Sequence, residues 1–175
     1  IDPQKIINDY GADAVRLFIL SDSPPEKDVQ WSDDGIQASY KFIQKFWNVN
    51  ERIEAQIQKK IKNKNFIDEF TNKILEKITK NLENFQYNVL ISNLHEIYNF
   101  FSKKIEDLDS ENLEKNYVKL IIAINPVIPH LTSECFELMQ FKDEKKWPEI
   151  DQKYVIDEEI KLVIQINGKK RSLIK

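Results

Sequence analysis

Apolar residues recur at helical spacing over most of this 175-residue chain, and no other feature constrains its fold as strongly. Four amphipathic helices are predicted, at about residues 36–62, 66–84, 87–105 and 111–125. Only three glycines are present, so the chain has few sites for tight turns. Short connections make an antiparallel bundle the simplest way to bury four apolar faces. The predicted fold class is therefore mainly α.

Two shorter helices are predicted before the bundle. Asp2 followed by Pro3 is a typical N-cap and first-turn pair, and the helix that it begins should end before Gly11. Residues 12–20 form the second helix. A double proline then ends any helix, and Ser32, followed by two aspartates, should cap the long helix of the bundle.

The helical period changes after the bundle. Pro126 and Pro129 interrupt the fourth helix, and helical spacing resumes over residues 131–139. Residues 160–166 are rich in β-branched side chains, and Asn167–Gly168 follows them, which predicts a hairpin because both turn residues must adopt positive φ. A lone hairpin is marginal in water. We therefore expect this small C-terminal β-hairpin element to belong to a domain that continues beyond the sequence.

Positive charge is concentrated in two blocks, although the net charge of the chain is −3. Residues 36–65 carry seven basic and two acidic side chains, and residues 155–175 carry five and three. A polyanion would therefore bind at these blocks. Six polar side chains of the long helix recur at steps of three and four, and should share one face opposite the apolar stripe. They are Lys41, Lys45, Asn48, Arg52, Gln56 and Lys59.

Sequence motifs for catalysis and cofactor binding are absent. The chain has no glycine-rich phosphate loop, no H-E-x-x-H, no C-x-x-C and no nucleophile elbow. His95 and His130 lie far apart without partner ligands, so we interpret both as structural residues and predict no metal site. Cys135 has no second cysteine to pair with and suits a reducing compartment.

The hydropathy and the first residues of the chain predict the cellular location of the protein. No apolar run approaches the roughly 18 residues that span a bilayer, so no membrane segment is expected. The first residue is Ile1 and no charged-then-apolar leader follows, so we expect a fragment of a longer protein without a signal peptide. These features together predict a cytoplasmic, globular protein.

Four parts of the chain, in order, resemble class I aminoacyl-tRNA synthetases. D-P-Q-K-I-I-N-D-Y-G-A-D-A-V-R-L-F-I-L at residues 2–20 resembles the segment that follows the K-M-S-K-S loop. S-P-P-E-K-D-V-Q-W-S-D-D-G-I-Q-A-S-Y-K-F-I-Q-K-F-W at 23–47 is similar to leucyl-tRNA synthetases of the bacterial type. N-P-V-I-P-H-L-T-S-E-C-F at 125–136 resembles the proline–histidine turn near the end of the family's anticodon-binding helical domain. W-P-E-I-D at 147–151 and V-I-Q-I-N-G-K-K-R at 163–171 are similar to the lead-in to its C-terminal domain.

The chain also departs from the family. The proline–histidine turn usually ends in E-E-L-W, whereas Glu134, Cys135 and Phe136 stand in that region, which we interpret as a repacked core. The H-I-G-H and K-M-S-K-S motifs, the editing insertion and most of the C-terminal domain are missing. The chain alone is therefore expected neither to activate leucine nor to edit.

The resemblance implies a division into three parts. Residues 1–35 would be the end of the catalytic region with its connector helices, 36–146 an anticodon-binding-type bundle, and 147–175 a linker with the truncated start of a C-terminal domain. The parent enzyme would ligate leucine to leucine tRNA with ATP and magnesium, and this portion, without a cofactor of its own, would bind and position the tRNA. Its partners would be leucine tRNA and the catalytic and editing domains of the same, monomeric polypeptide.

The resemblance also suggests which residues meet RNA. Contacts are expected mainly to phosphate and sugar, with little reliance on the leucine anticodon itself. The candidates are Lys41, Lys45, Asn48, Arg52 and Lys59 on the long helix, and Lys169, Lys170 and Arg171 after the predicted turn. The alternative for the helix is an ordinary solvated face in which charged side chains cover apolar surface. The alternative for the hairpin is an edge strand whose charges discourage aggregation.

Other residues are given structural roles, and other functions stay open. Arg16 is expected to pair with Asp13 on the same helix, three residues before it. Trp31 and Trp47 are interpreted as core anchors rather than base-stacking platforms. One alternative function is a stand-alone helical module that binds protein through an exposed apolar face. Another is the same domain of a valyl-, isoleucyl- or methionyl-tRNA synthetase, against which the P-P-E-K-D-x-x-W-S pattern argues.

Overall fold

A computed structural model describes residues 2–22, 27–141, 146–156, 162–166 and 169–174. The described residues form seven α-helices, and the prediction of a mainly α fold is confirmed. The helices are α1 (Pro3–Tyr10), α2 (Ala12–Asp22), α3 (Asp33–Gln58), α4 (Asp68–Glu83), α5 (Tyr87–Lys104), α6 (Ser110–Ile124) and α7 (Pro129–Leu138). Short 3-10 helices occur at Ile105–Asp107 (η1) and Gln152–Tyr154 (η2).

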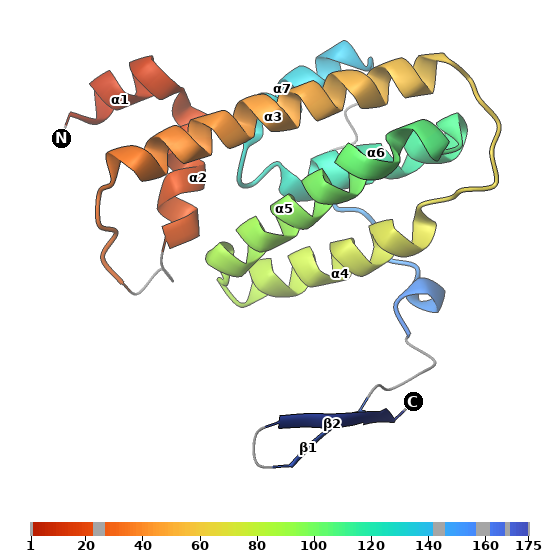
Figure 1. Cartoon of the computed structure of the whole chain (residues 1–175). Helices are drawn as coiled ribbons and strands as arrows, with labels where there is room; N and C mark the ends of the chain where they lie inside the picture. Colours follow the sequence, from red (N-terminus) through yellow and green to blue (C-terminus); the bar gives the residue numbers. More distant parts are fainter. Residues whose placement is uncertain (1, 23–26, 142–145, 157–161, 167–168, 175) are drawn as a thin grey trace.

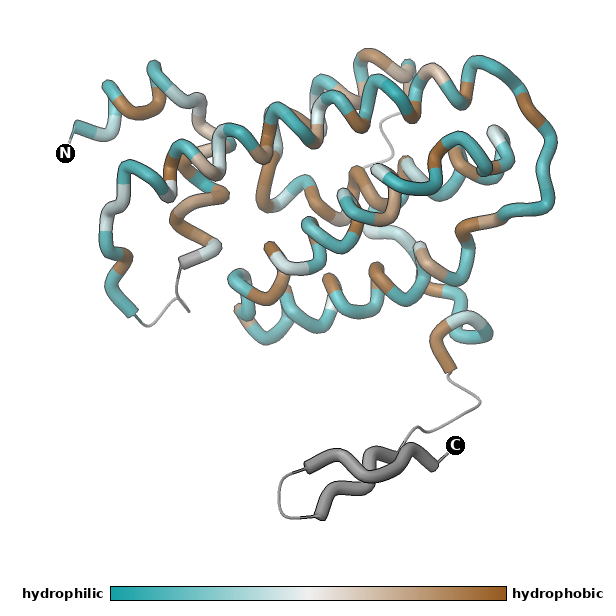
Figure 2. Tube along the Cα trace, in the orientation of Figure 1, coloured by the Kyte–Doolittle hydropathy of each residue, from teal (hydrophilic) through white to brown (hydrophobic). Residues whose placement is uncertain are grey.

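Helices α3 to α6 form an antiparallel bundle with an up-and-down path (Figure 1). Helix α5 packs against both α3 and α4, and α6 packs against the same two helices. Their shared core includes the fully buried side chains of Ile53, Ile78, Leu94, Phe101 and Tyr117. Figure 2 shows hydrophobic and hydrophilic residues alternating along these helices. This is the pattern of amphipathic helices that each bury one face.

Helices α1 and α2 pack against the first turns of α3 and form a smaller apolar cluster. Ala14 and Phe18 of α2 are buried there with Ile36 of α3. Gly35 makes this packing possible, because a Cβ atom at that position would lie 2.6 Å from Cε2 of Phe18. Ser32 Oγ accepts the Gly35 N–H at 3.1 Å, so the predicted cap of α3 is confirmed.

A pair of charged side chains joins α2 to the turn between α6 and α7. The Asp13 carboxylate accepts the backbone N–H groups of His130 at 3.2 Å and Leu131 at 2.7 Å. Arg16 donates from Nε to the Val127 carbonyl at 3.1 Å, and from Nη2 to the carbonyl of the preceding proline. The predicted pairing of Asp13 with Arg16 is therefore wrong. Both side chains instead bind backbone groups that the ends of two helices leave unpaired, and each has the sign that the helix dipole favours there.

Helix α3 ends earlier than its apolar periodicity predicts, because the start of α6 binds the backbone of its last turn. Ser110 Oγ donates to the carbonyl of Gln56 at 2.7 Å and accepts the Ile61 N–H at 2.9 Å. Asp109, the N-cap of α6, also accepts the N–H of Asn63 at 3.1 Å. These contacts hold the loop between α3 and α4 against α6.

Two strands are described near the C-terminus. β1 (Leu162–Ile166) pairs antiparallel with β2 (Lys169–Ile174), and Ile166 lies opposite Lys169. The register shifts between Ile164 and Gln165. The predicted turn at Asn167–Gly168 lies outside the described residues. The preceding segment is fastened to α4, where the Asn72 side chain accepts the Asp151 N–H at 2.8 Å.

Replacing Asp13 should destabilise the whole chain. We expect Asp13→Ala to lower the free energy of unfolding by about 1.5–3 kcal/mol, because two N–H groups lose a charged acceptor. Asp9→Ala is the matched control, since Asp9 is an exposed acid on the neighbouring helix α1 and should change this value by less than about 0.5 kcal/mol. Urea unfolding followed by circular dichroism measures both. Equal urea midpoints for the two variants would show that water replaces the carboxylate without cost.

The Asp109 cap should make stability depend on acid pH. Hydrogen bonds from the backbone N–H groups of Asn112 and Asn63 hold the pKa of Asp109 below its usual range. Because this pKa is lower in the folded state, the stabilisation is complete above the unfolded value, about 3.9, and is lost as the pH falls through the folded value.

We expect Asp109→Ala to be less stable than the wild type at pH 7, with the difference shrinking below about pH 4. Asp109→Asn keeps a neutral acceptor and should retain part of the cap while losing this pH dependence. Urea midpoints measured from pH 7 to pH 3 test both variants. A wild-type advantage over Asp109→Asn that stays constant over that range would contradict the assignment.

Candidate nucleic-acid interface

Helix α3 carries a row of exposed polar side chains along its length. Lys41, Lys45, Asn48 and Arg52 are all exposed, as their spacing predicts. Among the described residues, neither Lys41 nor Lys45 forms an ion pair with a carboxylate. These four residues are here called the α3 basic row, and three of them, Lys41, Lys45 and Arg52, present positive charge to solvent. At its C-terminal end the row reaches η1, where Arg52 contacts Glu106.

Gln56 does not belong to the exposed face. Its side chain is 1% exposed, and Nε2 donates to the carbonyls of Glu106 at 3.3 Å and Leu108 at 3.1 Å. The prediction that Gln56 shares the basic surface is therefore wrong. Helical spacing could not reveal this, because the partner is a 3-10 segment fifty residues away in the chain. Lys59 lies just beyond the helix, is exposed, and donates to Gln56 Oε1 at 3.4 Å.

Arg52 is only loosely held. Its Nη2 atom lies 3.4 Å from Oε1 of Glu106, and the two side chains are 45% and 79% exposed. An exposed ion pair of this kind contributes about 0–1 kcal/mol. The guanidinium group can therefore leave Glu106 for a phosphate at small cost.

The loop after α3 continues the positive charge. Lys60 and Lys64 are exposed, whereas Lys62 forms an ion pair with Glu111 that raises the pKa of the lysine. Lys60 and Lys64 were not among the predicted RNA contacts. The excess of basic residues between 36 and 65 was the signal that could have identified them.

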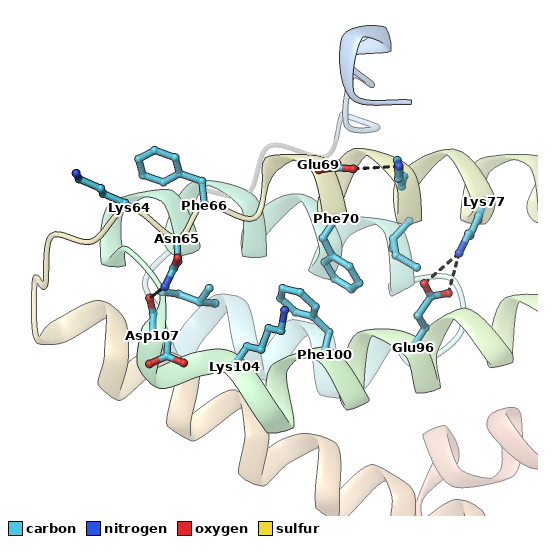
Figure 3. A pocket seen from close by; sticks show the side chains of 13 residues that line it. Lys64, Asn65, Phe66, Glu69, Phe70, Lys77, Glu96, Phe100, Lys104 and Asp107 are labelled. Carbon is cyan, nitrogen blue, oxygen red and sulfur yellow. Dashed lines mark hydrogen bonds and ion pairs between the residues drawn. The ribbon is translucent and has the colours of Figure 1, made fainter. Parts of the chain in front are cut away.

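A groove lies between α4 and α5 beyond this loop (Figure 3). Its volume is 610 Å³. Phe70 and Phe100 form its floor, with their rings stacked at 3.8 Å and 9°. Phe66 stands at its edge and is 63% exposed. The sequence predicted these phenylalanines as parts of helices but did not indicate a groove.

A second hollow, of 840 Å³, lies among α1, α2, α3 and α7. Trp47 and Asn48 line it from α3, so Asn48 borders this hollow as well as the basic row. Trp47 is half-buried against the main core, in agreement with its predicted role. Trp31 packs edge-on against Phe18 at 5.2 Å, which also fits an anchor between α2 and α3.

His95 and Cys135 have surroundings that fit structural roles. His95 is exposed at its edge, its ring centre lies 4.1 Å from that of Phe42, and partial desolvation lowers the pKa of its imidazole. Burial raises the pKa of the Cys135 thiol to about 12, so the thiol stays protonated at neutral pH. No group of three or more His, Cys, Asp or Glu side chains within the described ranges could hold a metal ion. None of the described helices is long and apolar enough to cross a membrane.

The predicted contacts near the C-terminus lie in β2. Lys169 pairs with Ile166 and Lys170 with Gln165 across the strands, and Arg171 follows them. As RNA contacts these three residues remain a prediction.

Known proteins resemble the chain over nearly its whole length. Residues 64–175 match the family model described as the anticodon-binding domain of tRNA ligase. The chain is 34% identical to a leucine–tRNA ligase of Petrotoga mobilis over 192 residues, which cover 99% of this chain and 23% of that protein. It is 37% identical to a leucine–tRNA ligase of Orientia tsutsugamushi over 186 residues, which cover 99% and 21%. The chain thus spans about a fifth to a quarter of the length of these relatives.

A solved structure has the same fold. The LeuRS (agnB2) of Agrobacterium radiobacter K84, crystallised as a ternary complex with tRNA and LeuAMS, superposes with a TM-score of 0.83 at 23% identity. The match covers 99% of this chain and 24% of that one. The predicted resemblance to leucyl-tRNA synthetases is confirmed by the two relatives and by this shared fold. Because the family model matches more than half of its residues, the chain belongs to the anticodon-binding domain family of tRNA ligases.

Proposed function

We propose that this chain is the tRNA-binding and positioning portion of a leucine–tRNA ligase, which joins leucine to leucine tRNA with ATP. The α3 basic row is the observation that carries the proposal, because it offers exposed cations with little competition from neighbouring carboxylates. Such a surface binds phosphates without reading sequence. The family membership and the two ligases similar to this chain support tRNA as the polyanion.

The chemistry of ligation is assigned to parts of the ligase outside this chain. The sequence has no phosphate-binding loop, so ATP and its magnesium would bind in the catalytic domain of the ligase. The contribution of the chain is to hold the tRNA body so that its 3′ end reaches the catalytic domain, which is catalysis by positioning. The Asp13 and Arg16 contacts support this role, because they tie α2 to the bundle.

The proposal also divides the chain into three parts and assigns the cellular location and oligomeric state of the complete ligase. Residues 1–35 would connect to the catalytic region, 36–146 would be the tRNA-binding bundle, and 147–175 would lead into a C-terminal domain that begins with the β1–β2 hairpin. Lys169, Lys170 and Arg171 would add contacts to the RNA backbone from that hairpin. We also propose that the complete ligase is a cytoplasmic monomer, whose catalytic and editing domains are the other partners of this chain.

Reversing charge on α3 tests the proposal. In the complete ligase, the triple variant Lys41→Glu, Lys45→Glu and Arg52→Glu should bind leucine tRNA weakly, because three phosphate contacts become repulsive. Leucine-dependent exchange of pyrophosphate into ATP should stay unchanged. The slope of log affinity against log salt should flatten by about two to three, close to one unit per lost contact. Filter binding at several salt concentrations measures affinity and slope.

The matched control reverses three exposed lysines on other helices, Lys5, Lys80 and Lys115. It changes the net charge by the same amount, so any difference from the α3 triple variant reflects position and not overall charge. If both triple variants bind tRNA equally at low salt, the α3 basic row is only a solvated surface and the proposed interface is wrong.

A further inference from the structure

The groove between α4 and α5 is separate from the α3 basic row, and the proposed function gives it no role so far. Its floor is the stacked pair of Phe70 and Phe100, and the exposed ring of Phe66 lies at one end (Figure 3). Phe66 is 63% exposed beside this hollow, so its ring is accessible to a ligand. The volume of the groove, 610 Å³, lies within the range of sites that hold small organic ligands.

Charge differs between the two ends of the groove. Along α4 the lysines are paired: Lys77 contacts Glu96 at 2.9 Å, and Lys73 contacts Glu69 at 3.0 Å. Near Phe66, Lys64 and Lys104 form no ion pair with a described carboxylate. The acids that line this end are Asp107 and Glu69, and Glu69 is already paired with Lys73. Lys104 Nζ lies 5.6 Å from the centre of the Phe100 ring. This end therefore combines aromatic surface with a net positive charge.

The loop that carries Lys64 and Phe66 is held in place before any ligand binds. The side chains of Asn63 and Asn65 both donate to the Asp107 carbonyl, at 2.6 Å and 3.0 Å. The N–H of Ile67 donates to Asn112 Oδ1 at 2.9 Å. A ligand would therefore meet a site whose backbone is already ordered, which lowers the entropic cost of binding.

We propose that this end of the groove binds an unpaired nucleotide of an RNA strand. The base would stack on the Phe66 ring, and the adjoining phosphate would lie beside the ammonium group of Lys64, the residue two positions before Phe66 (Figure 3). Aromatic rings combined with cations are the arrangement by which proteins hold single-stranded nucleic acid. An apolar ligand would leave the Lys64 ammonium group without a partner, and a paired base could not expose its face to the ring.

The nucleotide site deepens the proposed function, since it takes RNA as the ligand of this chain. It also lies close to the α3 basic row. Arg52 contacts Glu106 in η1, and the next residue of η1, Asp107, lines the groove. One RNA molecule could thus contact the row with its paired backbone and the groove with an unpaired nucleotide.

Phe66→Leu separates stacking from apolar contact, because leucine keeps apolar surface but has no ring face. The probes are a 12-nucleotide single-stranded RNA and a 12-base-pair RNA duplex, both fluorescently labelled, and the readout is fluorescence anisotropy. We expect Phe66→Leu to weaken binding of the single strand to the 175-residue chain about tenfold. Binding of the duplex should change less than twofold. Lys64→Ala with Lys104→Ala should weaken binding of the single strand and flatten its salt dependence.

Phe85→Leu is the matched control, because Phe85 is also a phenylalanine beside a helix end and is 62% exposed. It should bind both probes as the wild type does. Equal affinities of Phe66→Leu and Phe85→Leu for the single strand would overturn the proposal. The proposal would also be overturned if Phe66→Leu reduced self-association of the chain but left RNA binding unchanged, because the groove would then bind a second copy of the chain.

The same measurements distinguish this failure from failure of the proposed function. If the α3 triple variant binds leucine tRNA normally while Phe66→Leu loses the single strand, the α3 interface fails and the nucleotide site stands. If the α3 triple variant loses tRNA while Phe66→Leu behaves as the wild type, the nucleotide site fails alone.

Discussion

The hydrogen bonds of Ser110 and Gln56 hold together the parts on which binding is proposed to depend. Ser110 Oγ bridges the end of α3 to the loop that follows, and the buried Gln56 side chain binds the carbonyls around η1. Both lie in a region of low polarity, where an unmade hydrogen bond costs about 1–3 kcal/mol. These contacts end α3 and direct the chain toward α4. The α3 basic row and the groove therefore keep a defined spacing.

A second junction sets the angle between the first two helices and the bundle. Asp13 and Arg16 bind opposite helix ends, and Gly35 lets the Phe18 ring approach the backbone of α3. The three contacts act from different directions, so α2 has little freedom to rotate on the bundle. In the proposed role of positioning tRNA this rigidity would matter, because an error of about 1 Å in placement can cost a hundredfold in rate.

Sequence patterns predicted the helices well where local forces decide. The apolar periodicity located the bundle helices within a few residues, and the caps at Asp2 and Ser32 were identified from side chains that bond their own neighbours. The predictions failed where a residue has a distant partner. Asp13 and Arg16 bind a turn more than a hundred residues away, and Gln56 binds η1. Spacing along one helix contains no information about such partners.

By itself, the sequence determined the mainly α fold class, the order of the helices, the positions of two caps and the resemblance to leucyl-tRNA synthetases. These follow from periodicity, local hydrogen bonding and residue patterns, all of which act over a few neighbouring residues. Only the tertiary structure decided that Gln56 is buried, that Arg52 is loosely paired with Glu106, and that Phe66 stands beside a groove with Lys64 and Lys104. The physical reason is that exposure and charge pairing depend on which helices pack together, and packing brings residues from separate elements side by side.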